Sequence, residues 1–143
     1  MVTVRLPDLG LDIARMPDLT DPATRKRLSP AAIEAFFKIA EYWELKNEDG
    51  MALLGGISSG RYYELKKSRK GILSRDELTS ISLLIGIFKA LNILFSRQLA
   101  NQWVSRPNTN PLFHNATPLA AMVQGIPQML TVRRLLDSRR GGR

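Results

Sequence analysis

Lysine and arginine are the side chains in this chain that point most directly to a binding function. Residues 61–143 contain fourteen of them against four Asp and Glu, a net charge of +10, whereas residues 1–60 contain seven against nine, a net charge of −2. A basic half of this kind predicts that the chain binds a polyanion or an acidic protein. A merely solvated surface can have the same composition, so the charge alone leaves that alternative open.

No other set of residues in the sequence fits a catalytic or metal-binding centre. Cysteine is absent and His114 is the single histidine, which excludes a disulfide framework, a zinc–cysteine site and a histidine cluster. The pairs Glu48-Asp49 and Asp76-Glu77 fit helix starts better than an acid–base couple. Because the chain also lacks a nucleophile–base pair and a glycine-rich phosphate loop, we expect no enzyme, no metal and no cofactor.

Residues 48–67, EDGMALLGGISSGRYYELKK, have the form of two short helices joined by a tight turn. The two glycines at 55–56 can adopt a positive φ without steric cost, and Ser58 is a good cap for the second helix. Tyr62 would then face back towards the first helix, where Ala52 is small enough for the two helices to touch. This pattern predicts a helix-turn-helix, whose second helix can enter a DNA major groove.

The outward face of that second helix and the basic segment after it supply the candidate DNA contacts. These residues are Ser59, Gly60, Arg61, Tyr63, Lys66, Lys67, Arg69 and Lys70. The cations among them could contact phosphates, which supply a large share of the affinity in protein–DNA complexes. Glu64 on the same face argues against DNA binding unless its carboxylate accepts a hydrogen bond from a cytosine. Reading two half-sites would require a dimer.

The segments before the motif are predicted to be helical. Residues 1–28 are expected to form an arm and a short basic helix, which an Asp-Pro pair at 21–22 opens and which runs through Arg27. A Ser-Pro pair at 29–30 repeats the start signal, so a second helix is expected from there to about residue 45. With the helix-turn-helix, this helix forms a predicted domain over residues 29–71.

The second predicted domain covers residues 72–143. Ser74 and Glu77 form a capping box that opens a long helix ending near residue 95. This helix is apolar on so much of its surface that we expect it to be buried at the centre of the fold. A final helix is expected over residues 127–139. Its expected apolar stripe consists of Leu130, Leu135 and Leu136. No segment has the alternation of a strand, so the fold class is all-α.

Two parts of the sequence carry a family resemblance. The first is ALLGGISSGRYYELKK at residues 52–67, followed by LSRDELTSISLLIGIFKALNILF at residues 73–95. The second is a series of C-terminal matches: Trp103, Arg106-Pro107-Asn108, Asn110-Pro111-Leu112-Phe113, Thr117-Pro118-Leu119, Met122, Gly125 and residues 132–142. In this order they resemble the Xre/ParS/MbcA-type antitoxins, which pair with RES-domain toxins in bacterial toxin–antitoxin operons. His114 and Asn115 stand where the family often has Gly-Gly, and Asn tolerates the positive φ of such a turn.

The resemblance implies an all-helical fold with an N-terminal helix-turn-helix and a C-terminal helical domain that binds the toxin. The cognate toxins are similar to ADP-ribosyltransferases in fold and degrade NAD, and the antitoxin blocks their active site with its C-terminal end. Such complexes commonly repress their own promoter. The expected partners are therefore a RES-domain toxin and operator DNA, with a homodimer inside a hetero-oligomeric complex. We expect this complex in the bacterial cytoplasm, without a membrane.

The resemblance also implies that the basic C-terminal helix and tail contact the toxin. The candidate residues are Arg133, Arg134, Asp137, Arg139, Arg140, Gly141, Gly142 and Arg143. By themselves these arginines fit a structural role, because cations are favourable at the negative end of a helix dipole. In a toxin cleft they could engage acidic or phosphate-binding groups bidentately. An alternative function is a stand-alone DNA-binding regulator whose apolar C-terminal half is a dimerisation domain.

Overall fold

The computed structural model describes residues 17–141, and every regular element in that range is a helix. The α-helices are α1 Pro22–Tyr42, α2 Asn47–Leu53, α3 Ser59–Ser68, α4 Arg75–Leu94, α5 Arg97–Gln102, α6 Pro118–Met122 and α7 Ile126–Gly141. Two 3-10 turns, η1 Trp103–Ser105 and η2 Pro111–Phe113, lie between α5 and α6. The predicted all-α class is confirmed. Of the arm and short helix predicted over residues 1–28, residues 1–16 lie outside the described residues.

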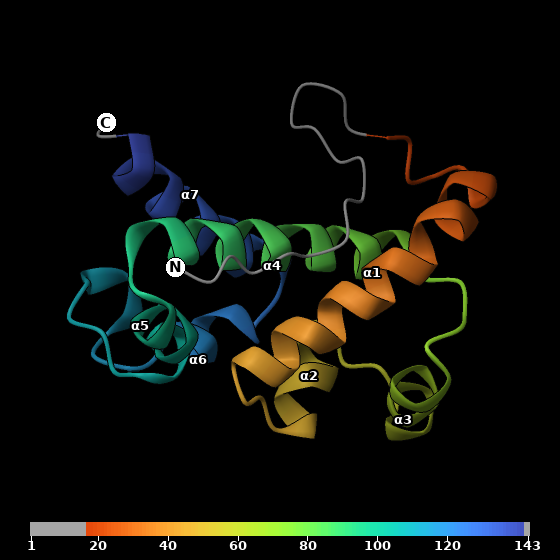
Figure 1. Cartoon of the computed structure of the whole chain (residues 1–143), viewed down its shortest axis with the longest axis horizontal. Helices are drawn as coiled ribbons and strands as arrows, with labels where there is room; N and C mark the ends of the chain where they lie inside the picture. The colour runs from red at the N-terminus through yellow and green to blue at the C-terminus, as the bar shows by residue number, and fades with distance from the viewer. Residues whose placement is uncertain (1–16, 142–143) are drawn as a thin grey trace.

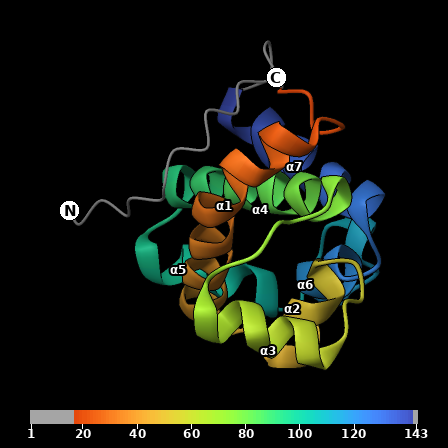
Figure 2. The same cartoon turned by 90° about the vertical axis from the view of Figure 1, so that its right-hand side faces the viewer.

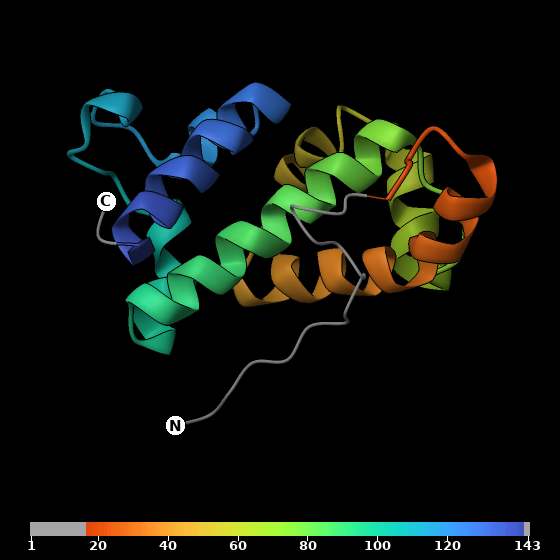
Figure 3. The same ribbon diagram turned by 90° about the horizontal axis from the view of Figure 1, so that it is seen from above.

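Helix α4 runs through the centre of the fold, with α2 and α3 towards one end and α5, α6 and α7 towards the other (Figures 1 and 3). Its predicted capping box is present: the Ser74 Oγ accepts from the Glu77 N–H at 3.1 Å, and the Glu77 carboxylate accepts from the Ser74 N–H at 2.7 Å. By length and composition α4 could cross a membrane, but 61% of its most apolar window is buried within the protein. It is therefore the core helix against which α1 and α7 pack.

Helix α1 is continuous from Pro22 to Tyr42, so the prediction of two helices separated at the Ser-Pro pair is wrong. Asp21 does cap its first turn, but Ser29 is not a cap. The Ser29 hydroxyl instead donates to the Arg25 carbonyl at 2.6 Å and accepts from the Leu73 N–H at 2.8 Å. Pro30 removes one helical hydrogen bond, and Figures 1 and 2 show the helix bending in this part. Buried residues on both sides of Pro30 keep the two parts in one helix.

Helix α7 packs against α4 and α6 with a different face from the one predicted. Its buried residues are Met129, Val132 and Leu136, whereas Leu130 and Leu135 are only half-buried. Only Leu136 of the predicted stripe is therefore correct. The residues at 129, 132 and 136 have the i, i+3, i+7 spacing of one helical face. The sequence did not distinguish this face, because apolar residues occur on several sides of the helix.

The loop between α5 and α6 contains a tight turn at His114 and Asn115, where the resembled family often has two glycines. His114 and Asn115 have φ values of 48° and 63°, and the Ala116 N–H donates to the Phe113 carbonyl across them at 2.7 Å. Phe113 is buried and meets Trp103 edge-to-face at 5.9 Å between ring centroids. Thr117 then caps α6 by accepting from the Ala120 N–H. The loop is therefore an ordered part of the C-terminal half.

Candidate nucleic-acid interface and C-terminal partner surface

The helix-turn-helix predicted from the sequence is formed by α2 and α3. Gly55 and Gly56 both have positive φ, at 93° and 78°, in the turn between the two helices. The Ser58 Oγ accepts from the Arg61 N–H at 3.2 Å and so caps α3 as predicted. Tyr62 is buried, together with Leu65, so the opposite face of α3 is left for solvent.

Gly50 of α2 lies against Tyr62 of α3, and the sequence had singled out Ala52 for such a contact. A Cβ placed on Gly50 would lie 2.8 Å from Cζ of Tyr62, so a side chain there would collide with the ring. Ala52 is half-buried. The Tyr62 ring also packs edge-to-face against Phe37 of α1, with centroids 5.4 Å apart. Gly50 is therefore a small residue that the contact between α2 and Tyr62 requires.

Arg61 links α3 to the first turn of α4 through an ion pair with Glu77. Its Nε and Nη2 donate to the two carboxylate oxygens of Glu77 at 3.1 and 2.8 Å, and Nη2 also reaches the Ile72 carbonyl at 3.3 Å. The Glu77 side chain is only 6% exposed, whereas that of Arg61 is 40% exposed. A bidentate pair of this kind fixes geometry as well as charge. Arg61, which the sequence predicted to contact a phosphate, therefore has a structural role in holding α3 against α4.

Three further predicted DNA contacts are engaged within the protein. The Asn47 amide nitrogen donates to the Tyr63 hydroxyl at 3.0 Å, and the Lys66 Nζ donates to the Asn47 amide oxygen at 2.9 Å. Arg69 donates to the Lys66 carbonyl at 2.8 Å and to a carboxylate oxygen of Glu34 at 3.3 Å. Sequence reasoning missed Asn47 and Glu34, because only the fold brings α1 and the start of α2 next to α3.

The remaining predicted DNA contacts form an open surface of α3 and the segment after it. These residues are Ser59, Gly60, Lys67 and Lys70, all exposed. Lys67 and Lys70 form no ion pair with any residue in the range 17–141, so their ammonium groups can meet phosphates. Figure 2 shows α3 at the edge of the molecule, clear of α4 and α7.

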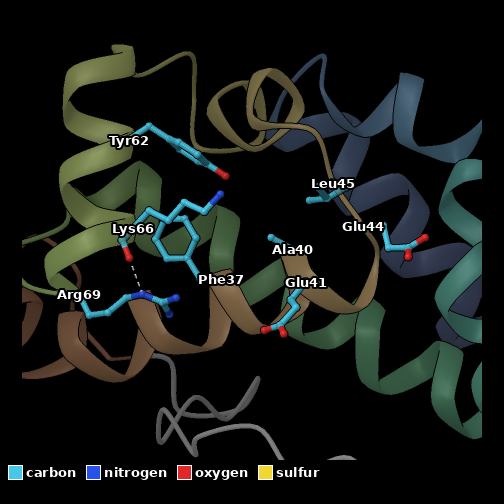
Figure 4. A pocket seen from close by; sticks show the side chains of 8 residues that line it. All are labelled: Phe37, Ala40, Glu41, Glu44, Leu45, Tyr62, Lys66 and Arg69. Carbon is cyan, nitrogen blue, oxygen red and sulfur yellow. Dashed lines mark hydrogen bonds between the residues drawn. The ribbon is translucent and has the colours of Figure 1, made fainter.

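A pocket of about 250 Å³ lies between α1 and α3, beside this surface (Figure 4). Its lining residues are Phe37, Ala40, Glu41, Glu44, Leu45, Tyr62, Lys66 and Arg69. The acidic residues come from α1 and the segment after it, and the two cations come from α3 and the residue that ends it, so the pocket has charges of both signs. Burial, with a smaller effect of Tyr63, raises the pKa of Tyr62 and keeps its hydroxyl neutral.

Two of the predicted toxin-binding residues form a contact inside the protein. The Arg133 Nε donates to Asp137 at 3.1 Å, and the Arg133 side chain is only 20% exposed. Its guanidinium lies against Gly86 of α4, where an added Cβ would be 2.6 Å from Nε. Arg140 is 3.9 Å from the other carboxylate oxygen of Asp137. Arg133 therefore helps to position α7 on α4.

The remaining predicted toxin-binding residues are on the surface of α7. Arg134 is exposed in the middle of the helix, and Arg139, Arg140 and Gly141 are exposed at its end. Gly142 and Arg143 lie outside the described residues. Leu136 is the last buried residue of the helix, so the turn after it extends beyond the core. Within residues 17–141 no group of acidic or histidine side chains is arranged to hold a metal ion.

A helix-turn-helix at one end of a central helix and a basic helical unit at the other define a protein with one unit for DNA and one for a protein partner. Residues 22–86 match the antitoxin Xre-like helix-turn-helix domain, and residues 90–142 match the antitoxin Xre/MbcA/ParS C-terminal toxin-binding domain. The chain belongs to the Xre/MbcA/ParS antitoxin family, as the resemblance indicated. It is therefore an antitoxin of a toxin–antitoxin system with a helix-turn-helix, and these domains are not enzymes.

A protein from Sinorhizobium fredii is similar to this chain over most of its length. The chain is 37% identical over 125 residues to the uncharacterized protein y4oB of Sinorhizobium fredii, strain NBRC 101917 / NGR234. The match covers 86% of this chain and 95% of that protein. The similarity therefore includes both the helix-turn-helix and the toxin-binding part.

Proposed function

We propose that this antitoxin neutralises a RES-domain toxin that degrades NAD, by placing the last turn of α7 and the tail in the active site of the toxin. One observation carries the proposal: α7 continues past its last buried residue, Leu136, into exposed basic residues. A solvent-facing turn that the core does not need can be inserted into a cleft without unfolding the antitoxin. Arg139 and Arg140 would then engage acidic groups of the cleft bidentately.

Truncation after Asp137 tests this mechanism. The variant keeps Leu136 and the Arg133–Asp137 contact, so α7 should still pack on α4. We expect co-purification with the RES-domain toxin encoded beside it to be weakened only slightly. The protection of cellular NAD should be lost to a much greater extent. Equal losses of complex formation and of NAD protection would show that the tail only holds the complex together.

A charge-reversal pair provides a matched control for the truncation. Arg139→Glu should impair neutralisation, because it places a carboxylate where the proposal requires a cation. Lys38→Glu makes the same change on the exposed side of α1, away from α7, and should leave neutralisation unchanged. A similar effect of the two variants would indicate a general response to net charge.

We also infer that the antitoxin represses its own operon as a homodimer whose two copies of α3 meet two half-sites. Exposed Lys67 and Lys70 beside the open face of α3 support this role. Binding to DNA from upstream of the gene should weaken steeply as salt is raised, because phosphate contacts release counterions. A flat dependence of log K on log[salt] would exclude such contacts, and a monomer on a single half-site would exclude the dimer.

A further inference from the structure

Neither the backbone conformation nor the packing of the chain requires a glycine at position 60. It lies in the first turn of α3 and is exposed. A Cβ added to it would meet no other atom within 4 Å, and its φ is not in the positive range. Gly55 and Gly56 have positive φ, whereas Gly50 is in close contact with Tyr62. Glycine is among the least favourable residues within a helix, so its presence at position 60 suggests that something outside the chain approaches closely there.

Glu64 lies on the same face, one helical turn after Gly60. Its side chain is exposed, and its carboxylate has no ion pair among residues 17–141. Tyr63 beside it is held by the hydrogen bond from Asn47. Arg61, the one arginine within α3, is turned away into its contact with Glu77. The open face of α3 therefore combines a smooth surface at Gly60 with a free hydrogen-bond acceptor at Glu64.

This arrangement suits one class of group in a DNA major groove. Phosphates repel a carboxylate, so a carboxylate on a DNA-facing helix is favourable only against a donor on a base edge. The donors there are the exocyclic amines of cytosine and adenine, and carboxylates characteristically accept from cytosine N4. Lys67 and Lys70, further along the chain, can supply the phosphate contacts that hold the helix in the groove.

We propose that α3 approaches the base edges most closely at Gly60, and that the Glu64 carboxylate accepts a hydrogen bond from the N4 amine of a cytosine in each half-site. The inference rests on the DNA binding proposed above and adds the base that is read. Glu64 is then a specificity-determining residue, and Gly60 allows the helix to come close enough for it to act.

The test uses the full chain and a pool of DNA duplexes with a randomised central segment. The wild-type chain should enrich duplexes with a cytosine at one fixed position of each half-site. Changing that cytosine to thymine should weaken binding of the wild-type chain at least about fivefold. The same change should have little effect on Glu64→Gln. Glu41→Gln, which changes another exposed carboxylate, on α1, is the matched control and should discriminate like the wild type.

Gly60→Ala tests the close approach separately. It should weaken binding to the enriched duplex at least about tenfold, while its thermal midpoint stays equal or rises, because alanine favours the helix. Binding to the toxin should be unchanged for Gly60→Ala and Glu64→Gln.

Three results would overturn the inference. They are an unchanged base preference in Glu64→Gln, unchanged DNA affinity in Gly60→Ala, and a loss of toxin binding instead of DNA binding, which would assign this face of α3 to the protein partner. If the wild-type chain enriches no duplex at all, the proposed DNA binding fails together with this inference.

Discussion

The Arg61–Glu77 pair fastens the DNA-facing helix α3 to the core helix α4, so its removal should affect stability by a predictable amount. In Glu77→Ala the Ser74 N–H loses its capping-box acceptor, which costs about 1 kcal/mol. The two hydrogen bonds from Arg61 are also lost. Because the Arg61 side chain is 40% exposed, solvent replaces part of them, and we assign the pair about 1 kcal/mol. The free energy of unfolding should therefore fall by about 2 kcal/mol.

A double-mutant cycle isolates the contribution of the pair. The free energy of unfolding is measured in urea for the wild type, Arg61→Ala, Glu77→Ala and the double variant. A coupling energy of about 1 kcal/mol is expected. The Arg69–Glu34 pair is the control, because it has one contact of 3.3 Å and its carboxylate is 55% exposed, against 6% for that of Glu77. Its coupling energy should be about 0.5 kcal/mol or less. Equal coupling in the two pairs would refute the reasoning.

DNA binding distinguishes the structural role of Arg61 from the phosphate contact that the sequence predicted. If the pair positions α3, Arg61→Ala and Glu77→Ala should both weaken DNA binding, with the slope of log K against log[salt] little changed. If Arg61 instead contacts a phosphate, Arg61→Ala should reduce that slope by about one, and Glu77→Ala should free the guanidinium and strengthen binding. The second pattern would refute the structural assignment.

Three other predictions concern the packing of the two units. Gly50→Ala should lower the urea-unfolding free energy by about 1–2 kcal/mol, because its Cβ collides with the Tyr62 ring and helix propensity offsets only part of the cost; an unchanged midpoint would contradict this contact. Since burial raises the pKa of Tyr62 above 10.0, the folded state retains a proton that the unfolded state loses, and stability should fall as the pH rises above about 10. Tyr62→Phe should remove the part of this decline that is due to Tyr62. Gly86→Ala should displace the Arg133 guanidinium, so adding Arg133→Ala should destabilise it no further in thermal unfolding; additive losses would show that the two residues act independently.

The features predicted correctly from the sequence are those that depend on neighbouring residues. Ser58 and Ser74 cap the helices that they precede, because a cap bonds to a backbone N–H only a few residues away. The apolar surface of α4 identified it as the buried helix, and spaced motifs identified the family. The same local reasoning was wrong at the Ser-Pro pair of α1, since a start signal cannot reveal that Ser29 bonds instead to Leu73.

Contacts between distant parts of the chain settle which basic residues are free to bind a partner. Arg61 is joined to a carboxylate sixteen residues away, and Arg133 lies against a glycine of a different helix. Both arginines resemble their exposed neighbours in sequence, because charge and helical position do not show which distant group a side chain will meet. The contact of Arg61 with Glu77 at the start of α4 and the packing of α7 on α4 make these two cations structural, whereas Lys67, Lys70 and the end of α7 stay on the surface.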